Sequence, residues 1–163
     1  MTRYASLDIV PVWARLNEEV IKLVDYVPDD KMNWGPKEGL WSIRGYFLHI
    51  ALARHNWMGR DVKDAGESVE DQAALAAKLL QEGQSRDGMK EQLRLSWQRV
   101  ERFLADPAKL DAHYDGIDAD GATVSHSGHW IAYHLLEHDV HHRADIFHYL
   151  ALLDIEHPEV GTP

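Results

Sequence analysis

The sequence of 163 residues contains no cysteine. Disulfide bonds, thiolate metal ligands and a cysteine nucleophile are therefore excluded, and any thiol chemistry needs a thiol from a co-substrate. No apolar run reaches about 18 residues, so a transmembrane helix is not expected. Basic residues are outnumbered, 17 against 27 acidic ones, which gives a net charge of −10. Such a chain would be repelled by nucleic-acid phosphates and anionic membrane surfaces, so we expect neither as a partner.

The N-terminal residues 1–4 lead directly into an amphipathic stretch and lack the basic-then-apolar layout of a secretory signal. We therefore expect a cytoplasmic protein. The length suits one domain, residues 1–163, and hydrophobic residues make up 45% of the chain, an ordinary share for a globular protein. Neither an internal repeat nor a domain linker divides the sequence.

Helical periodicity dominates the sequence, and strand-like alternation is nearly absent. Apolar residues at three- and four-residue spacing predict helices over 7–27, 42–62, 89–104 and 127–153, with a short helical piece at 73–80. The segment 106–128, with its Asp-Gly turn signals, is expected to be a loop. Four long amphipathic helices with one wide crossover predict an all-α four-helix bundle, with a short extra helix between its second and third helices.

Histidine is enriched, with 11 residues in total, and five of them lie between His134 and His148 in the last predicted helix. Residues four apart share one helical face, with Cβ atoms about 5–6 Å apart. The pairs His134/His138 and His138/His142 could therefore each reach one metal ion. One such pair alone is more often an ordinary feature of an amphipathic helix, but five histidines on one helix favour a common role.

Two ligands on one helix do not hold a catalytic metal well, so a third must come from elsewhere in the chain. His49 is the best candidate, because it lies at the edge of the apolar stripe of the second predicted helix, whereas His55 lies on another part of the wheel. A lone histidine in the position of His49 is more often a core-edge residue. For His134 we favour a position facing the bundle core over a ligand role, and His141 supports the ligands or is structural.

These features resemble the DinB/YfiT-like superfamily over most of the chain. The segment 27–44 and the tripeptide Leu48-His49-Ile50 are similar to the family's entry into its second helix, which carries the first ligand. The stretch 134–143 resembles the family's most distinctive motif, in which the ligands correspond to His138 and His142. The expected cofactor is one divalent metal ion on these three histidines. Zinc or nickel is expected first, with iron or another ion as the alternative.

The chain departs from the family after the arginine of this motif. The family often continues with Gly-Gln, and this chain has Ala144-Asp145 instead. Asp145 follows His142 by three residues and His141 by four. It either approaches the site, caps a neighbouring imidazole ring, or is a solvated surface carboxylate.

The resemblance also implies a function. Some relatives transfer a low-molecular-weight thiol such as bacillithiol to electrophiles, others isomerise maleylpyruvate with mycothiol, and many are named metal-dependent hydrolases. Zinc on three neutral imidazoles lowers the pKa of water to about 7 and would likewise deprotonate a thiol. Our leading hypothesis is therefore a metal-dependent enzyme that transfers a low-molecular-weight thiol to a small-molecule electrophile. Its catalytic residues beyond the metal ligands are not specified.

Two alternatives belong to other classes. One is a hydrolase that uses metal-activated water, and the other is a non-catalytic binding module that the metal stabilises. Family members often pair through helices, so the resemblance also implies a homodimer.

Overall fold

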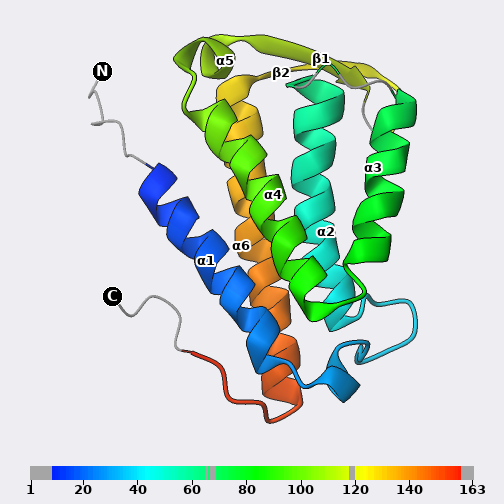
Figure 1. Cartoon of the computed structure of the whole chain (residues 1–163). Coiled ribbons are helices and arrows are strands. Elements are labelled where there is room, and N and C mark those ends of the chain that lie inside the picture. The colour runs from blue at the N-terminus through cyan, green and yellow to red at the C-terminus, as the bar shows by residue number, and fades with distance from the viewer. Residues whose placement is uncertain (1–8, 65, 67–68, 118–119, 159–163) are drawn as a thin grey trace.

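The computed structural model describes residues 9–64, 66, 69–117 and 120–158 (Figure 1). Four long helices form the bundle and confirm the predicted helical architecture. They are α1 (Val10–Tyr26), α2 (Ile43–Asn56), α4 (Arg86–Leu104) and α6 (Gly128–Leu152). The remaining elements are a 3₁₀ turn (Asp29–Lys31), a π-helical segment (Trp57–Asp61), α3 (Val69–Glu82), α5 (Pro107–Asp111), β1 (His113–Ile117) and β2 (Thr123–Ser127).

Three of the bundle helices begin directly after a serine that caps their first turn. The Ser42 hydroxyl accepts a hydrogen bond from the Gly45 amide at 3.1 Å, and Ser85 and Ser127 act in the same way at the starts of α4 and α6. A serine oxygen in this position satisfies an amide that the helix itself cannot pair. Because Ser85 is a cap, α4 begins at Arg86, three residues before the predicted start.

The extra helix lies where it was predicted, between the second and third bundle helices, but it is longer. It spans 14 residues as α3 rather than the short piece 73–80. Gln81 and Glu82 extend it at its C-terminal end, because both residue types are good helix formers even where they face solvent. Leu79 is its fully buried anchor on the bundle.

The expectation of a loop over 106–128 is wrong. Asp106 caps the short helix α5, and β1 and β2 then form an antiparallel hairpin in which Gly116 is opposite Val124. The Asp-Gly pair at 115–116 lies within β1 rather than in a turn. A Cβ atom on Gly116 would lie 2.8 Å from the Asp61 Oδ1 atom, so the glycine lets the strand pass close to this side chain.

The core lies between α1, α2, α4 and α6 and is a continuous cluster of buried apolar side chains. Trp13 of α1 and Trp97 of α4 meet edge to face within it, with ring centroids 5.4 Å apart. Such aromatic pairs contribute about 0.5–1.5 kcal/mol beyond the area that they bury. Among the described helices, none is long and apolar enough to cross a membrane.

Candidate metal centre

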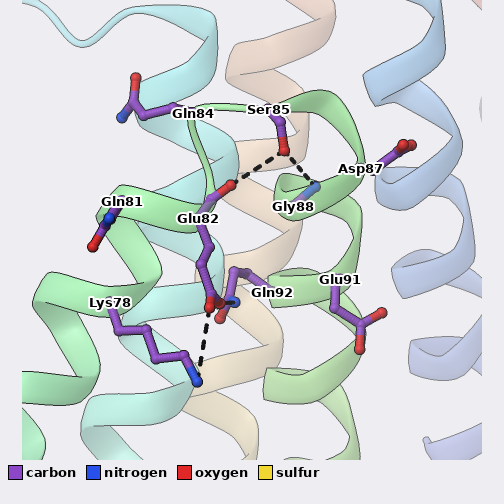
Figure 2. Close-up of a pocket in the computed structure, with 9 residues that line it drawn as sticks. All are labelled: Lys78, Gln81, Glu82, Gln84, Ser85, Asp87, Gly88, Glu91 and Gln92. Atoms are coloured by element: carbon purple, nitrogen blue, oxygen red, sulfur yellow. Dashed lines mark hydrogen bonds and ion pairs between the residues drawn. The ribbon is translucent and has the colours of Figure 1, made fainter.

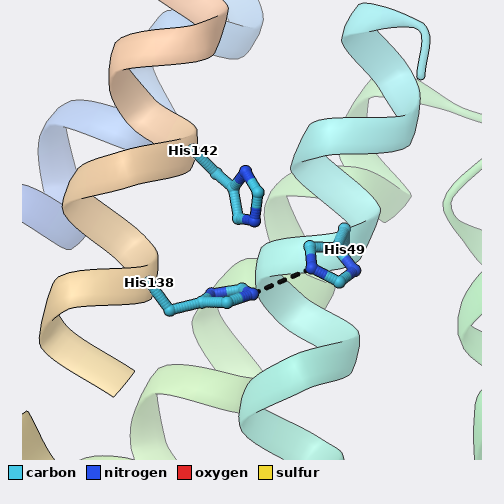
Figure 3. Close-up of side chains that lie close together, drawn as sticks. All are labelled: His49, His138 and His142. Atoms are coloured by element: carbon cyan, nitrogen blue, oxygen red, sulfur yellow. Dashed lines mark hydrogen bonds between the residues drawn. The ribbon is translucent and has the colours of Figure 1, made fainter. Parts of the chain in front are cut away.

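The structure brings the three predicted ligands together between two helices. His49 lies in the middle of α2, and His138 and His142 lie one turn apart on α6 (Figure 3). The ring centroids are 4.7 Å apart for His49 and His138, 4.8 Å for His49 and His142, and 4.4 Å for His138 and His142. All three rings are half-buried and point toward a common centre.

The ring nitrogens lie close to the spacing that a metal ion requires. One nitrogen from each of the three rings lies within 4.8 Å of the other two, and the Nε2 atoms of His49 and His138 are 2.8 Å apart. Tetrahedral zinc with Zn–N bonds of about 2.0–2.1 Å places its ligand nitrogens about 3.3 Å apart. Small ring rotations would convert the observed arrangement into a three-imidazole metal site.

The rings of His49 and His142 are neutral near neutral pH. Burial, followed by the neighbouring His138 and His142, lowers the pKa of His49 to about 4. Burial also lowers the pKa of His142, although hydrogen bonding to Asp145 opposes this effect. A neutral imidazole offers a nitrogen lone pair, so both rings are in the state in which they can bind a metal.

A buried ion pair lies directly beneath His138. Arg54 of α2 and Asp139 of α6 are both 0% exposed, and the Arg54 Nη2 and Nε atoms donate to Asp139 Oδ2 at 2.8 and 3.0 Å. Trp13 Nε1 donates to the same oxygen at 2.7 Å. Burial alone would raise the pKa of Asp139, but the Arg54 charge and these hydrogen bonds outweigh it and hold the pKa below its usual value. Asp139 is therefore an anion inside the bundle.

The other oxygen of Asp139 provides a test of whether a metal fits. Asp139 Oδ1 and His138 Nδ1 are both buried and 3.7 Å apart, and neither has a hydrogen-bond partner in the described part of the chain. A histidine that binds a metal through Nε2 carries its proton on Nδ1 and usually donates it to a carboxylate. If His138 bound a metal through Nε2, its Nδ1–H would be the donor and Asp139 Oδ1 the acceptor. The residues present therefore fit the ion.

Asp145 lies on the far side of His142. Its Oδ2 atom is 3.0 Å from His142 Nδ1 and 3.6 Å from His141 Nε2. Of the outcomes considered for Asp145, the structure therefore shows the one in which the carboxylate caps a neighbouring ring. His141 itself is 69% exposed and lies outside the three-histidine group.

Two other histidines considered from the sequence, His134 and His55, lie apart from the three-histidine group. For His134 we favoured a position facing the bundle core, and the structure shows a half-buried side chain in contact with two tryptophans. Its ring stacks on Trp130 with centroids 4.9 Å apart and an interplanar angle of 6°, and it meets Trp57 edge to face at 5.1 Å. His55 is buried on a different side of α2, with its Nδ1 atom 3.3 Å from Arg99 Nη1.

Trp41 forms a wall beside the histidines. Its ring centroid is 4.0 Å from that of His49 and 5.7 Å from that of His142, and its side chain is 44% exposed. Tyr46 packs against both Trp41 and His142, at 5.5 and 5.4 Å. The indole therefore covers one side of the cluster and remains partly exposed to solvent.

A polar pocket of about 900 Å³ lies elsewhere, at the turn between α3 and α4 (Figure 2). Its Glu82 carboxylate accepts a hydrogen bond from Gln92 at 2.6 Å and lies 3.7 Å from the Lys78 ammonium. The pocket shares no residue with the histidine cluster. Its central carboxylate is already paired within the chain.

Sequence reasoning missed Arg54 and Asp139. Both could have been found, because Arg54 falls on the same helical stripe as Phe47 and Ile50, and Asp139 follows Leu135 by one turn. A charged residue in an apolar stripe requires a partner, and opposite charges in the stripes of two helices suggest that they pair. Trp41 precedes its helix, and its contact with His49 depends on the path of the loop before α2.

Comparisons with known proteins identify the same fold in three crystal structures. The crystal structure of a protein described as a member of the DinB family from Exiguobacterium sibiricum matches with a TM-score of 0.70 and 18% identity, over 96% of this chain and 99% of that one. A DinB-like protein from Bacillus cereus gives 0.62 and 16%, over 93% and 95%. One from Bacillus subtilis gives 0.55 and 20%, over 93% and 95%. At these identities the likeness shows the fold alone.

A search of the curated proteins finds no match. The sequence itself matches the DinB superfamily profile over residues 13–146, which includes all three clustered histidines and most of the chain. The protein is therefore a member of the DinB superfamily.

Proposed function

We propose that this protein is a metal-dependent enzyme that transfers a low-molecular-weight thiol to a small electrophile. The observation that carries the proposal is the convergence of three imidazoles from two helices, with two of the facing nitrogens 2.8 Å apart. A divalent ion held there would lower the pKa of a thiol and so supply a sulfur nucleophile at neutral pH. His49, His138 and His142 would hold the ion.

The residues of the cluster suit this use. Neutral imidazoles do not compensate the charge of a divalent ion, so the ion would keep its full attraction for a thiolate. Three protein ligands leave one position of a tetrahedral ion open for a substrate. Trp41, which contacts His49 and is partly exposed, would exclude water from one side of that position and offer an apolar surface to the electrophile.

The chain has no cysteine, so the thiol would be a second substrate. With an aryl halide as the electrophile, the sulfur–carbon bond forms and the carbon–halogen bond breaks. The halide leaves with the bonding electron pair, and the thiol proton passes to the buffer. The reaction involves no oxidation or reduction, so no further co-reactant is needed.

Elemental analysis and a thiol-dependent assay test the proposal. Wild-type protein should bind about one equivalent of metal. His138→Ala and His142→Ala should lose it, whereas His141→Ala, an exposed histidine on the same helix, should keep it. Conjugation of 1-chloro-2,4-dinitrobenzene should then be measured with glutathione or bacillithiol as the thiol.

We expect wild type and His141→Ala to show metal-dependent turnover with a thiol. His138→Ala should lose this turnover. Hydrolysis of activated esters without any thiol would replace thiol transfer by the hydrolase alternative. Tight metal binding without turnover of either kind would favour the non-catalytic binding module.

A further inference from the structure

Asp145 makes a short, directed contact with the outer nitrogen of one clustered histidine. Its Oδ2 atom lies 3.0 Å from His142 Nδ1, within normal hydrogen-bond length, and its side chain is 26% exposed. The two residues are three apart on α6, so the helix itself brings them to the same face. The contact therefore depends on one rigid element rather than on a loop.

The ring of His142 is confined from the other directions. Trp41 and Tyr46 pack against it at centroid distances of 5.7 and 5.4 Å, and the rings of His49, His138 and the exposed His141 also lie beside it. A neutral imidazole carries one proton, on either Nδ1 or Nε2. In this confined ring, the choice between the two nitrogens decides whether a lone pair or an N–H faces the other histidines.

We propose that Asp145 is a positioning residue that keeps the His142 proton on Nδ1 and thereby directs the Nε2 lone pair into the three-histidine cluster. A carboxylate only accepts hydrogen bonds, so it selects the tautomer with Nδ1–H, and a charged acceptor makes this bond stronger than a neutral one would. The inference rests on the proposed metal site. Asp139 Oδ1 lies 3.7 Å from His138 Nδ1, beyond hydrogen-bond length, so Asp145 is the carboxylate that already contacts a ring nitrogen of the cluster.

A second use of the same atoms is a further metal ion shared by His141, His142 and Asp145. That ion would need His142 to bind through both nitrogens, and the ring would have to lose its remaining proton. The 3.0 Å separation of Asp145 Oδ2 and His142 Nδ1 is a hydrogen-bond distance, and His141 is largely exposed. The hydrogen bond is therefore the favoured arrangement, and metal stoichiometry separates the two.

The test compares Asp145→Ala and Asp145→Asn with wild type and with His141→Ala. Long-range ¹H–¹⁵N spectra of the metal-free proteins, at mildly alkaline pH, report which nitrogen of His142 carries the proton. We expect Nδ1–H in wild type and His141→Ala, and a mixture or Nε2–H in Asp145→Ala. Asp145→Asn keeps an acceptor without the charge, so it should be intermediate. A merely structural role would not move this tautomer signal.

Zinc affinity, measured by competition with a chromophoric chelator, is the second readout. Asp145→Ala should bind zinc about 10–100-fold more weakly than wild type, and His141→Ala within about twofold of it. An unchanged tautomer and affinity in Asp145→Ala, with wild type binding zinc, would overturn this inference and leave the proposed function standing. If wild type bound two zinc ions per chain, and both Asp145→Ala and His141→Ala lost the second ion, the shared-ion site would replace the tautomer role of Asp145. A wild type that binds no zinc would overturn both proposals.

Discussion

The buried pair of Arg54 and Asp139 allows a quantitative prediction about stability. Arg54→Met keeps much of the side-chain volume but removes the guanidinium that donates twice to Asp139 Oδ2 and once to Asn17 Oδ1, at 2.8 Å. Asp139 would then be a buried anion that keeps, among the described residues, Trp13 alone as a hydrogen-bond donor. Breaking a fully buried ion pair from one side costs about 3–5 kcal/mol.

That loss is a large part of the stability of an ordinary domain, about 5–15 kcal/mol. For a chain of this length it corresponds to a fall of about 6–20 °C in the melting temperature. The loss of stability is measured by urea and thermal unfolding of the metal-free protein, with circular dichroism as the signal. Metal is removed so that ligand binding near His138 does not contribute to the difference.

A double variant separates the lost pair from lost packing. Arg54→Met combined with Asp139→Leu removes both buried charges, and such replacements are often neutral or stabilising. The double variant should therefore be more stable than Arg54→Met alone, and the cycle should give a coupling of several kcal/mol. A loss of less than about 1 kcal/mol in Arg54→Met would mean that this pair behaves like an exposed one, and the reasoning would fail.

Two further predictions concern other buried positions. Burial, followed by Arg99, lowers the pKa of His55 to about 4, so between about pH 6.5 and 4 the unfolded chain binds a proton that the folded chain does not. The free energy of unfolding should therefore fall by up to about 3 kcal/mol as the pH drops through this window, and His55→Asn should show a correspondingly smaller fall in urea titrations. Gly128→Ala would place a Cβ atom 2.2 Å from the Lys109 carbonyl oxygen, and because backbone cannot retreat like a flexible side chain, we expect a loss of about 2 kcal/mol or more. Wild-type stability of Gly128→Ala in urea would contradict this estimate.

The local sequence pattern was enough to predict the bundle helices and to narrow the ligands on the last helix to two pairs, His134/His138 and His138/His142. The family resemblance then favoured the second pair. Spacing within one helix fixes where His138 and His142 lie relative to each other, whatever the helix packs against. The position of His49 beside them depends on the register of α2 against α6, which no local pattern contains. Its assignment therefore relied on the helical wheel and on the family resemblance.

The hairpin and the carboxylates show the limits of pattern reading. Each strand has only five residues, with Gly116 in one and two serines in the other. Its apolar–polar alternation is therefore too short and too polar to predict a strand from the sequence. Asp145 could be placed near His142 by spacing, but the ring nitrogen that it contacts depends on a rotamer. Asp139 is informative only once its helical stripe is known to be the buried one.

The bundle should not need its metal to fold, and this prediction separates a catalytic ion from a structural one. The core is a continuous apolar cluster, and the three histidines lie half-buried outside it. Chelated wild type should therefore keep its helical circular dichroism and unfold cooperatively. Zinc at 1,000 times its dissociation constant should stabilise it by about 4 kcal/mol, the amount that linkage predicts. His142→Ala, which cannot complete the site, should match chelated wild type with or without zinc. If chelation alone unfolds the bundle, the ion is part of the fold, and the non-catalytic binding module becomes the better account of this protein.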